Sequence, residues 1–403
     1  MKKYLFIAAI AFPVMVFAQR NSQWRGDGRD GIYNETSLLK AWPANGPQML
    51  WQYEGLGDGY TSAAIANGKL YITGLDGDKL ILYVFDMTGK MLTKKEVGKE
   101  WTTNYIGPRG TVCVNDGKLY INNSLGTLVC LDEATLNEVW TKNLLTDFDG
   151  RNIMWGMTES PLIVGEKLFI TPGGVRNNMV ALNKNTGALI WSSLGEGATS
   201  SYCSPQYISN QSIPMMVTST MRHVVAFNVD TGEKLWSHLQ LPQNPARNIH
   251  SNTPLYSDGM IFTSTGYRGG SMLLRLKDGG KAVEQVWKND VDNQIGGMIK
   301  VGDYVFTTGH HNRGFFCIDW KTGAIKYKAD GFAPSAIVYA DGMLYVYSEN
   351  GEMNLIKPNP EKFELVSSFK VTLGTNQHWA HPVIHQGVMY LRHGDALMAY
   401  KIN

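Results

Sequence analysis

The sequence repeats one short phrase, and this repeat constrains the fold more than any other feature. Residues 179–191 read MVALNKNTGALIW, and residues 224–236 read VVAFNVDTGEKLW. In both, a small residue is followed by Gly six positions later and by Trp ten positions later. Other copies are Cys130 to Trp140, Cys317 to Tyr327, and weaker or stretched versions at 83–93, 274–287 and 355–365. A repeat with a period of about 40–50 residues is typical of β-propeller blades.

A second phrase precedes each copy and consists of a strand, a tight turn ending in Gly, and another strand. Examples are AAIANGKLYITG at 63–74 and TPLYSDGMIFTST at 253–265. Asn-Gly and Asp-Gly pairs between alternating apolar runs are strong signals for a β-hairpin. Each unit therefore contains four strands, because one strand precedes the Thr-Gly turn and a last one carries the Trp. Apolar residues alternate by two almost throughout, which predicts an all-β chain.

The number of units predicts how the ring closes. Seven units are complete, whereas the eighth, at 378–403, stops after its third strand. The run PQMLWQYEG at 47–55 has a strand pattern, with Trp51 where the Trp of the repeat should stand. A ring joined by both chain ends pairs strand edges that would otherwise be exposed. We therefore expect one eight-bladed β-propeller with four-stranded blades over 47–403, its last blade closed by the N-terminal strand, and an arm at 19–46 along one face.

The repeat also resembles a known family. The run Ala181, Asn183, Thr186-Gly187 and Trp191 resembles the tryptophan-docking motif of the PQQ-like propeller repeat, and residues 23–51 resemble the leader of secreted bacterial PQQ-like repeat proteins. The resemblance implies that the aromatic residue of each blade packs against the next blade, where a large flat ring is well buried between twisted sheets. The expected docking residues are Trp51, Trp140, Trp191, Trp236, Trp287 and Tyr327.

The first 18 residues, MKKYLFIAAIAFPVMVFA, have the pattern of a secretory signal peptide. Two lysines precede an apolar run that is too short to span a membrane comfortably. We expect cleavage near Ala18 and a periplasmic or secreted protein. Loss of Lys2 and Lys3 takes the formal charge from +2 to 0. A neutral chain without basic runs gives no electrostatic reason to bind nucleic acid or an anionic membrane, so neither partner is predicted.

Candidate functional residues lie in the loops that enter each innermost strand, because propellers usually carry function at one mouth of the central channel. Rings and polar groups that converge on an axis suit a small molecule or a carbohydrate. Solvated loop ends collect the same polar residues without a ligand, and each His also fits a hydrogen-bonded loop residue. The candidates are Arg109, Trp155, Glu159, His250, Asn252, Trp379 and His381. Arg109 and Glu159 fit either an ion pair between blades or separate contacts to a ligand.

No metal site is predicted. In GHHNRG, at 309–314, His310 and His311 would point to opposite faces if they lay on a strand, and they could not share a metal. The four cysteines, Cys113, Cys130, Cys203 and Cys317, have no zinc-binding spacing. Cys130 and Cys317 occupy the small-residue position of the repeat, which favours a packing role.

The resemblance also bears on activity. The quinoprotein alcohol dehydrogenases of this superfamily carry two adjacent cysteines, hold Ca²⁺ through acidic and amide side chains, and are longer because insertions wall the pocket. Here no two cysteines are adjacent, and nearly every residue belongs to a blade. The resemblance therefore implies a non-catalytic member, similar to the propeller subunit of the outer-membrane β-barrel assembly machine, with no cofactor predicted.

The leading hypothesis is thus a secreted or periplasmic binding or scaffold protein that uses one channel mouth. Its ligand would be an envelope protein, a peptide or a saccharide. One alternative is an oxidoreductase for an alcohol or sugar that uses PQQ with calcium. Another is a polysaccharide-processing enzyme, in which Glu159 would supply the carboxylate.

Overall fold

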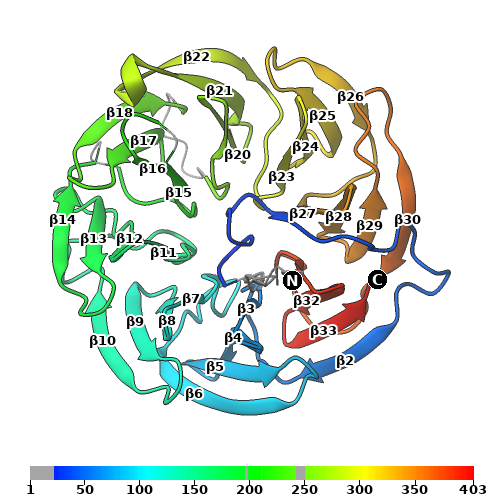
Figure 1. The fold of residues 1–403 in the computed structure, drawn as a ribbon, viewed down its shortest axis with the longest axis horizontal. Coiled ribbons are helices and arrows are strands. Elements are labelled where there is room, and N and C mark those ends of the chain that lie inside the picture. The colour runs from blue at the N-terminus through cyan, green and yellow to red at the C-terminus, as the bar shows by residue number, and fades with distance from the viewer. Residues whose placement is uncertain (1–21, 196–197, 210, 242–249) are drawn as a thin grey trace, which may run out of the picture.

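The computed structural model describes residues 22–195, 198–209, 211–241 and 250–403. The expected signal peptide lies outside these residues. Eight β-sheets stand around a central axis (Figure 1), and no α-helix occurs in the described part of the chain. The predicted fold, an all-β propeller of eight four-stranded blades, is confirmed.

The first four blades follow one another along the chain, each running from the innermost to the outermost strand. The first contains β3 (Ala64–Ala66), β4 (Lys69–Asp76), β5 (Lys79–Asp86) and β6 (Met91–Lys99). The second contains β7 (Cys113–Asn115), β8 (Lys118–Asn122), β9 (Thr127–Asp132) and β10 (Glu138–Asn143). The third contains β11 (Leu162–Val164), β12 (Lys167–Ile170), β13 (Met179–Asn183) and β14 (Leu189–Ser193). The fourth contains β15 (Gln206–Ile208), β16 (Met215–Ser219), β17 (His223–Asn228) and β18 (Lys234–Leu239).

The later blades repeat this order, with one short 3₁₀ turn, η1 (Asp278–Gly280), in the fifth. The fifth contains β19 (Leu255–Ser257), β20 (Met260–Thr265), β21 (Gly270–Lys277) and β22 (Ala282–Asn289). The sixth contains β23 (Met298–Val301), β24 (Tyr304–Gly309), β25 (Gly314–Asp319) and β26 (Ile325–Ala329). The seventh contains β27 (Ser335–Ala340), β28 (Met343–Ser348), β29 (Glu352–Ile356) and β30 (Leu365–Lys370). The eighth contains β31 (Val383–His385), β32 (Val388–His393), β33 (Ala396–Lys401) and, from the N-terminal part, β2 (Met49–Glu54).

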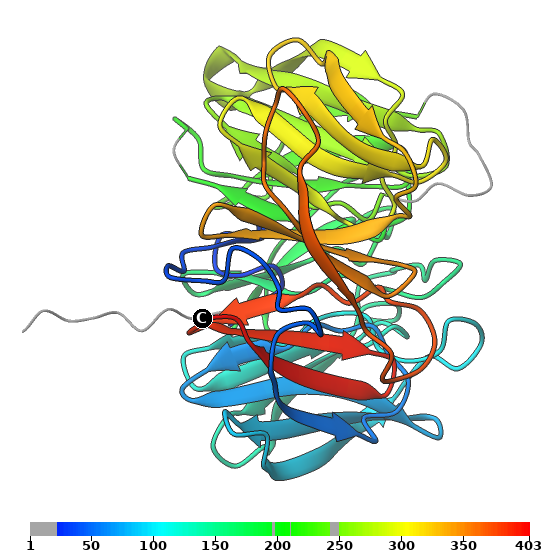
Figure 2. The same ribbon diagram turned by 90° about the vertical axis from the view of Figure 1, so that its right-hand side faces the viewer.

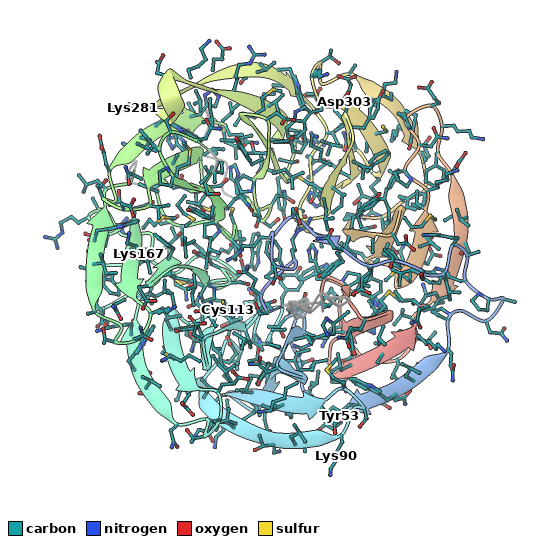
Figure 3. All side chains as sticks on the ribbon, viewed as in Figure 1. Tyr53, Lys90, Cys113, Lys167, Lys281 and Asp303 are labelled. Carbon is teal, nitrogen blue, oxygen red and sulfur yellow. The ribbon has the colours of Figure 1, made fainter. Side chains whose placement is uncertain are left out.

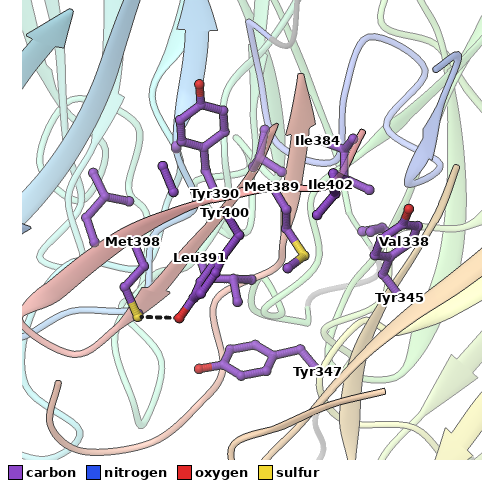
Figure 4. Packing of buried hydrophobic residues seen from close by; sticks show 14 of the residues in the cluster. Val338, Tyr345, Tyr347, Ile384, Met389, Tyr390, Leu391, Met398, Tyr400 and Ile402 are labelled. Carbon is purple, nitrogen blue, oxygen red and sulfur yellow. Dashed lines mark hydrogen bonds between the residues drawn. The ribbon is translucent and has the colours of Figure 1, made fainter. Parts of the chain in front are cut away.

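The eighth blade is closed by the N-terminal strand, as the unit count predicts. β2 pairs antiparallel with β33, and Trp51 lies opposite Ala399. Figure 4 shows the core of this blade, where Tyr390 and Tyr400 pack beside Tyr345 and Tyr347 of the seventh blade. The two chain ends are therefore held in one sheet with a shared apolar core.

The repeated phrase places its aromatic residue against the following blade. Ala181 pairs with Trp191 across β13 and β14. A Cβ added to Gly232, in the turn of the next blade, would lie 2.6 Å from Trp191 ring carbons. The Trp191 Nε1–H donates to the carbonyl of Val229 at 3.0 Å. The Gly of the phrase therefore has two roles, since it adopts a positive φ of 75° and leaves room for the indole.

Three further tryptophans make the same contact. Trp51, Trp140 and Trp287 lie against the turn glycines of their following blades and donate Nε1–H to Met87, Lys184 and Trp320 carbonyls at 3.2, 3.0 and 2.9 Å. Trp236 is buried, but its Nε1–H has no acceptor among the described residues. The copy of the phrase in the next blade, at 274–287, is the stretched one. Tyr327 is half-buried in the core between the sixth and seventh blades.

The cysteines are packing residues in the structure. All four are free and buried. Cys130 and Cys317 stand opposite Trp140 and Tyr327, in the position that Ala takes elsewhere. Figure 3 shows Cys113 toward the centre of the ring, whereas charged residues such as Lys90 and Lys281 lie at its rim.

The described part of the arm, 22–46, runs from the centre of the ring to its periphery (Figure 1). β1 (Ile32–Tyr33) adds a parallel strand to β27. Trp42 is buried, with its ring centroid 5.7 Å from that of Tyr345 and 5.8 Å from that of Phe369. The arm gathers on one face of the disc (Figure 2), at the carboxyl ends of the innermost strands. It therefore covers the face opposite to the predicted channel mouth.

Candidate ligand site at the channel mouth

A pocket of about 200 Å³ lies at the channel mouth, on the face opposite to the arm. Its walls come mainly from the loops that enter the innermost strands, as the sequence predicts. Seven of its lining residues are aromatic: Trp24, Tyr60, Tyr105, Trp155, Tyr202, Tyr267 and Trp379. We call this cavity, lined by these rings together with Arg109, Thr158, Ser204, Ser251, Gln294, Ile295 and His381, the mouth pocket.

The rings form two groups. The ring centroid of Trp379 lies 5.0 Å from that of Tyr60 and 5.0 Å from that of Tyr105. Its Nε1–H donates to the Glu349 carboxylate at 2.8 Å, which fixes the indole. In the second group, the ring centroid of Trp155 lies 5.8 Å from that of Tyr202 and 6.5 Å from that of Tyr267, and the Trp155 and Tyr267 rings are nearly parallel. Tyr60 and Tyr202 are buried, Tyr105 is 44% exposed, and the other three rings are half-buried. The seventh ring, Trp24, belongs to neither group and packs edge-on against His381.

The arm closes the floor of the mouth pocket. Arg25 is buried in the channel and donates to the carbonyls of Gly296 at 2.6 Å and Met298 at 2.8 Å. Arg29 similarly donates to the carbonyls of Ser160 and Pro161 at 2.7 and 3.1 Å. The arm therefore plugs the channel, and the mouth pocket is a closed cup.

Arg25 also fixes the state of His381. The guanidinium of Arg25 lies 3.1 Å from His381 Nδ1, which must accept, while Nε2–H donates to the Ile295 carbonyl at 2.8 Å. Burial, with the Arg25 charge beside it, lowers the pKa of His381 to about 3. His381 is therefore a neutral imidazole at physiological pH, and both of its nitrogens are already occupied.

Arg109 is the ionised side chain of the mouth pocket. Its guanidinium donates to the carbonyls of Gly107, Asn104 and Tyr105, and it lies 5.8 Å from the ring centroid of Tyr60. These contacts hold it in place, and of the two alternatives left open by the sequence, the ion pair with Glu159 is not formed. Burial raises the pKa of the Tyr60 phenol to about 12, which keeps that lining group neutral. No carboxylate stands among the described lining residues.

Four of the seven predicted candidates, Arg109, Trp155, Trp379 and His381, line the mouth pocket. The structure places the other three in the wall behind it. Asn252 donates to the carbonyls of Ser264 and Asn293, and His250 is 1% exposed, without a partner for either ring nitrogen among the described residues. Burial lowers the pKa of His250 to about 3. These residues do not contact the pocket space.

Glu159 is also a wall residue. Its Oε2 accepts the backbone N–H of Thr171 at 3.1 Å, whereas Oε1 has no partner within the described residues. Burial raises the pKa of its carboxyl to about 8, although Thr171 and the Arg29 charge oppose this shift. Glu159 does not line the mouth pocket, so its carboxyl does not reach a polysaccharide held there.

A second cluster lies next to the mouth pocket, and here a sequence inference was wrong. His310 and His311 belong to the turn between β24 and β25, not to a strand, so their side chains do not point apart. Their Nδ1 atoms are 3.2 Å from each other and lie 3.7 and 3.4 Å from Asp292 Oδ2. The centroid of Tyr267, which lines the mouth pocket, lies 4.8 Å from that of His310.

Comparison with known proteins gives the family. A family model described as outer membrane protein assembly factor BamB matches residues 137–363, which is more than half of the chain. The chain belongs to this family of PQQ-like propellers. Among curated proteins, BamB of Shewanella oneidensis is 28% identical over 47% of this chain and 46% of its own length. The quinoprotein ethanol dehydrogenase of Pseudomonas aeruginosa is 34% identical over 21% of this chain and 13% of its own length.

Solved structures agree with the fold. BamB from Moraxella catarrhalis matches with a TM-score of 0.66 at 12% identity, over 88% of this chain and 100% of that one. Quinohemoprotein alcohol dehydrogenase from Comamonas testosteroni matches with a TM-score of 0.69 at 11% identity, over 95% of this chain and 80% of that one. At these identities the likeness concerns the fold alone. The chain spans about half the length of the first curated relatives that it matches. Within the described residues, no helix is long and apolar enough to cross a membrane.

Proposed function

We propose that this chain is a non-catalytic binding protein of the cell envelope, which holds a segment of a partner protein in the mouth pocket. The observation that carries the proposal is the lining itself, where seven aromatic rings surround one guanidinium, Arg109. Aromatic residues and Arg are enriched at protein interfaces, and Trp, Tyr and Arg dominate the residues whose truncation weakens binding most.

The size of the mouth pocket favours an anchor over a whole enclosed ligand. Its volume of about 200 Å³ is below the roughly 300–1,000 Å³ of sites that enclose drug-sized molecules. One or two side chains of a longer partner fit this space, while the rest of the partner lies across the surrounding loops. The family, described as an outer membrane assembly factor, and the expected signal peptide point to a partner in the envelope.

The residues present do not fit PQQ with calcium. Ca²⁺ takes six to eight oxygen ligands, with carboxylates among them. The described lining offers no carboxylate, and Glu159 is enclosed in the wall with a raised pKa. The four cysteines are free and buried. No two of them are adjacent in sequence, in contrast to the pair of adjacent cysteines in the quinoprotein alcohol dehydrogenases.

A saccharide is a second candidate, and one observation favours it. Hydroxyl and amide groups of Thr158, Ser251 and Gln294 line the mouth pocket together with the aromatic rings. Rings that cover an apolar sugar face, with neutral polar groups that fix its hydroxyls, are a common arrangement for carbohydrate recognition.

The test is capture of a partner by the purified mature protein from an envelope extract, followed by measurement of its affinity. Trp155→Ala and Trp379→Ala should each weaken binding at least about 30-fold, which corresponds to about 2 kcal/mol. Tyr256→Ala is the matched control, because Tyr256 is half-buried on β19 and does not line the mouth pocket. Equal affinities of all three variants and the unaltered protein would contradict the proposal.

A glycan array with the same variants separates the second candidate. Binding of a sugar that is lost in Trp155→Ala and Trp379→Ala, with no protein partner captured, would replace the protein ligand by a saccharide. A quinone absorption band after addition of PQQ and Ca²⁺, with reduction of a dye by alcohols, would contradict both.

A further inference from the structure

Three potential metal ligands converge beside Tyr267, outside the mouth pocket. Asp292 follows β22, and His310 and His311 lie in the turn between β24 and β25. The Asp292 carboxylate and the two imidazole Nδ1 atoms all lie within 4.8 Å of one another. Two imidazoles and one carboxylate are a common ligand set for divalent transition metals.

The three distances match the edges of a coordination shell. The separations are 3.2 Å between the two Nδ1 atoms, and 3.4 and 3.7 Å from Asp292 Oδ2 to the Nδ1 atoms of His311 and His310. A tetrahedral zinc ion with bonds of about 2.0–2.1 Å separates its ligand atoms by about 3.3–3.4 Å. One ion therefore reaches all three atoms with small side-chain adjustments.

The carboxylate is already oriented for this role. Asp292 is almost completely buried, and its Oδ1 accepts the backbone N–H groups of His310 and His311 at 3.2 and 3.0 Å. Its Oδ2 accepts the N–H of Arg268 at 2.9 Å. The group is thus a fixed oxygen ligand, and such outer hydrogen bonds are typical around metal sites.

The imidazoles leave a path for an ion. Their side chains are 21% exposed for His310 and 36% for His311, so the outer side of the cluster is open to water. The backbone N–H of Tyr267 lies 3.2 Å from His310 Nδ1. An ion would exchange this hydrogen bond for a stronger bond to the same nitrogen. Without an ion, the facing Nδ1 atoms of His310 and His311 can share only one hydrogen, in a single hydrogen bond between the two imidazoles.

We propose that Asp292, His310 and His311 form a binding site for one divalent cation of the zinc class, with a water molecule as fourth ligand. The ion would tie the 309–314 turn to Asp292, which also accepts the backbone N–H of Arg268, the residue after Tyr267 of the mouth pocket. This site does not depend on the identity of the ligand held in the mouth pocket.

The test is titration of Zn²⁺ into tag-free, chelator-treated mature protein, followed by calorimetry. We expect one ion per chain, with an affinity that falls at least about tenfold in His311→Ala and in Asp292→Asn. His238→Ala, which removes a half-buried His from β18, should bind like the unaltered protein. Co²⁺ in place of Zn²⁺ should give visible absorption bands of a tetrahedral ion, and these bands should be lost in His311→Ala.

Because Asp292 is buried, its variant is checked for folding by circular dichroism, and the exposed His311 provides the independent test. Equal affinities of His311→Ala and the unaltered protein would overturn the proposal, as would fewer than half an ion per chain. In that case the cluster is a hydrogen-bonded histidine pair on a fixed carboxylate.

Discussion

Gly232→Ala tests whether the indole of each blade packs on the turn glycine of the next. The added Cβ would lie 2.6 Å from two Trp191 ring carbons, about 1 Å closer than carbon atoms normally approach. Trp191 cannot simply move away, because its Nε1–H donates to the Val229 carbonyl and its ring centroid lies 5.6 Å from that of Phe169. Displacing a packed core side chain costs about 1–3 kcal/mol. Backbone strain at a positive φ adds about 1–2 kcal/mol.

Gly259→Ala is the matched control for this prediction. Gly259 has the same φ of 75° as Gly232, but a Cβ there meets no atom within 4 Å. The control variant should lose about 1–2 kcal/mol from backbone strain alone. Gly232→Ala should therefore be less stable than Gly259→Ala by about 1–3 kcal/mol.

Urea unfolding followed by circular dichroism measures both variants, provided that the slope with denaturant is unchanged. A double-variant cycle with Trp191→Phe should show coupling, since a smaller ring leaves room for the new methyl group. Equal losses in Gly232→Ala and Gly259→Ala would refute the packing argument, because the cost would then come from the backbone alone.

Three further predictions follow from the buried groups. Arg25→Met should lower the free energy of unfolding by roughly 3–5 kcal/mol, since it leaves several buried carbonyls without donors; an unchanged urea midpoint would show that the arm does not plug the channel. His250 and His381 stay neutral in the folded chain but protonate when it unfolds, so each should lower the free energy of unfolding by about 1.4 kcal/mol per pH unit as the pH falls below about 6.5. His381→Gln should make this pH dependence shallower, and identical slopes in the variant and the unaltered protein would contradict the buried, neutral state. Glu159 keeps its proton in the folded chain, so its cost to the free energy of folding grows between about pH 4.5 and 8. Glu159→Gln should raise the free energy of unfolding by roughly 2–4 kcal/mol at pH 8 and by less at pH 5. An equal gain at the two pH values would contradict the raised pKa.

The fold was predictable because the repeated phrase reflects a packing contact that recurs in four of the eight blades. A positive-φ glycine under an indole restricts the residue types at both positions, so the phrase persists where other residues vary. The closing strand was found because Trp51 keeps its place in the phrase although β2 lies far from β33 in sequence. Trp236 shows the limit of the pattern, since it is buried like the other tryptophans although its Nε1–H has no acceptor among the described residues.

The candidate site was only partly predictable, for two physical reasons. The arm carries no repeat, so nothing in the sequence placed Trp24 in the mouth pocket or Arg25 and Arg29 in the channel. With the channel filled by the arm, Glu159 and His250 become enclosed wall residues and do not face an open axis.

Turns are the second reason. Tyr267 and the pair His310 and His311 lie in turns between the second and third strands of their blades, which strand periodicity does not describe. The side-chain alternation that predicts opposite faces applies only to extended backbone. Gly-Tyr-Arg-Gly-Gly at 266–270 signalled the turn, but not the direction of the Tyr267 ring.

Site-specific photo-crosslinking is the measurement that most directly tests binding at the mouth. A photoreactive residue in place of Tyr105, which is 44% exposed at the rim of the mouth pocket, should capture the partner in intact envelopes. The same residue in place of Tyr256, which does not line the mouth pocket, should capture little. Capture from Tyr256, with none from Tyr105, would show that the partner binds elsewhere and that the aromatic mouth is not the site.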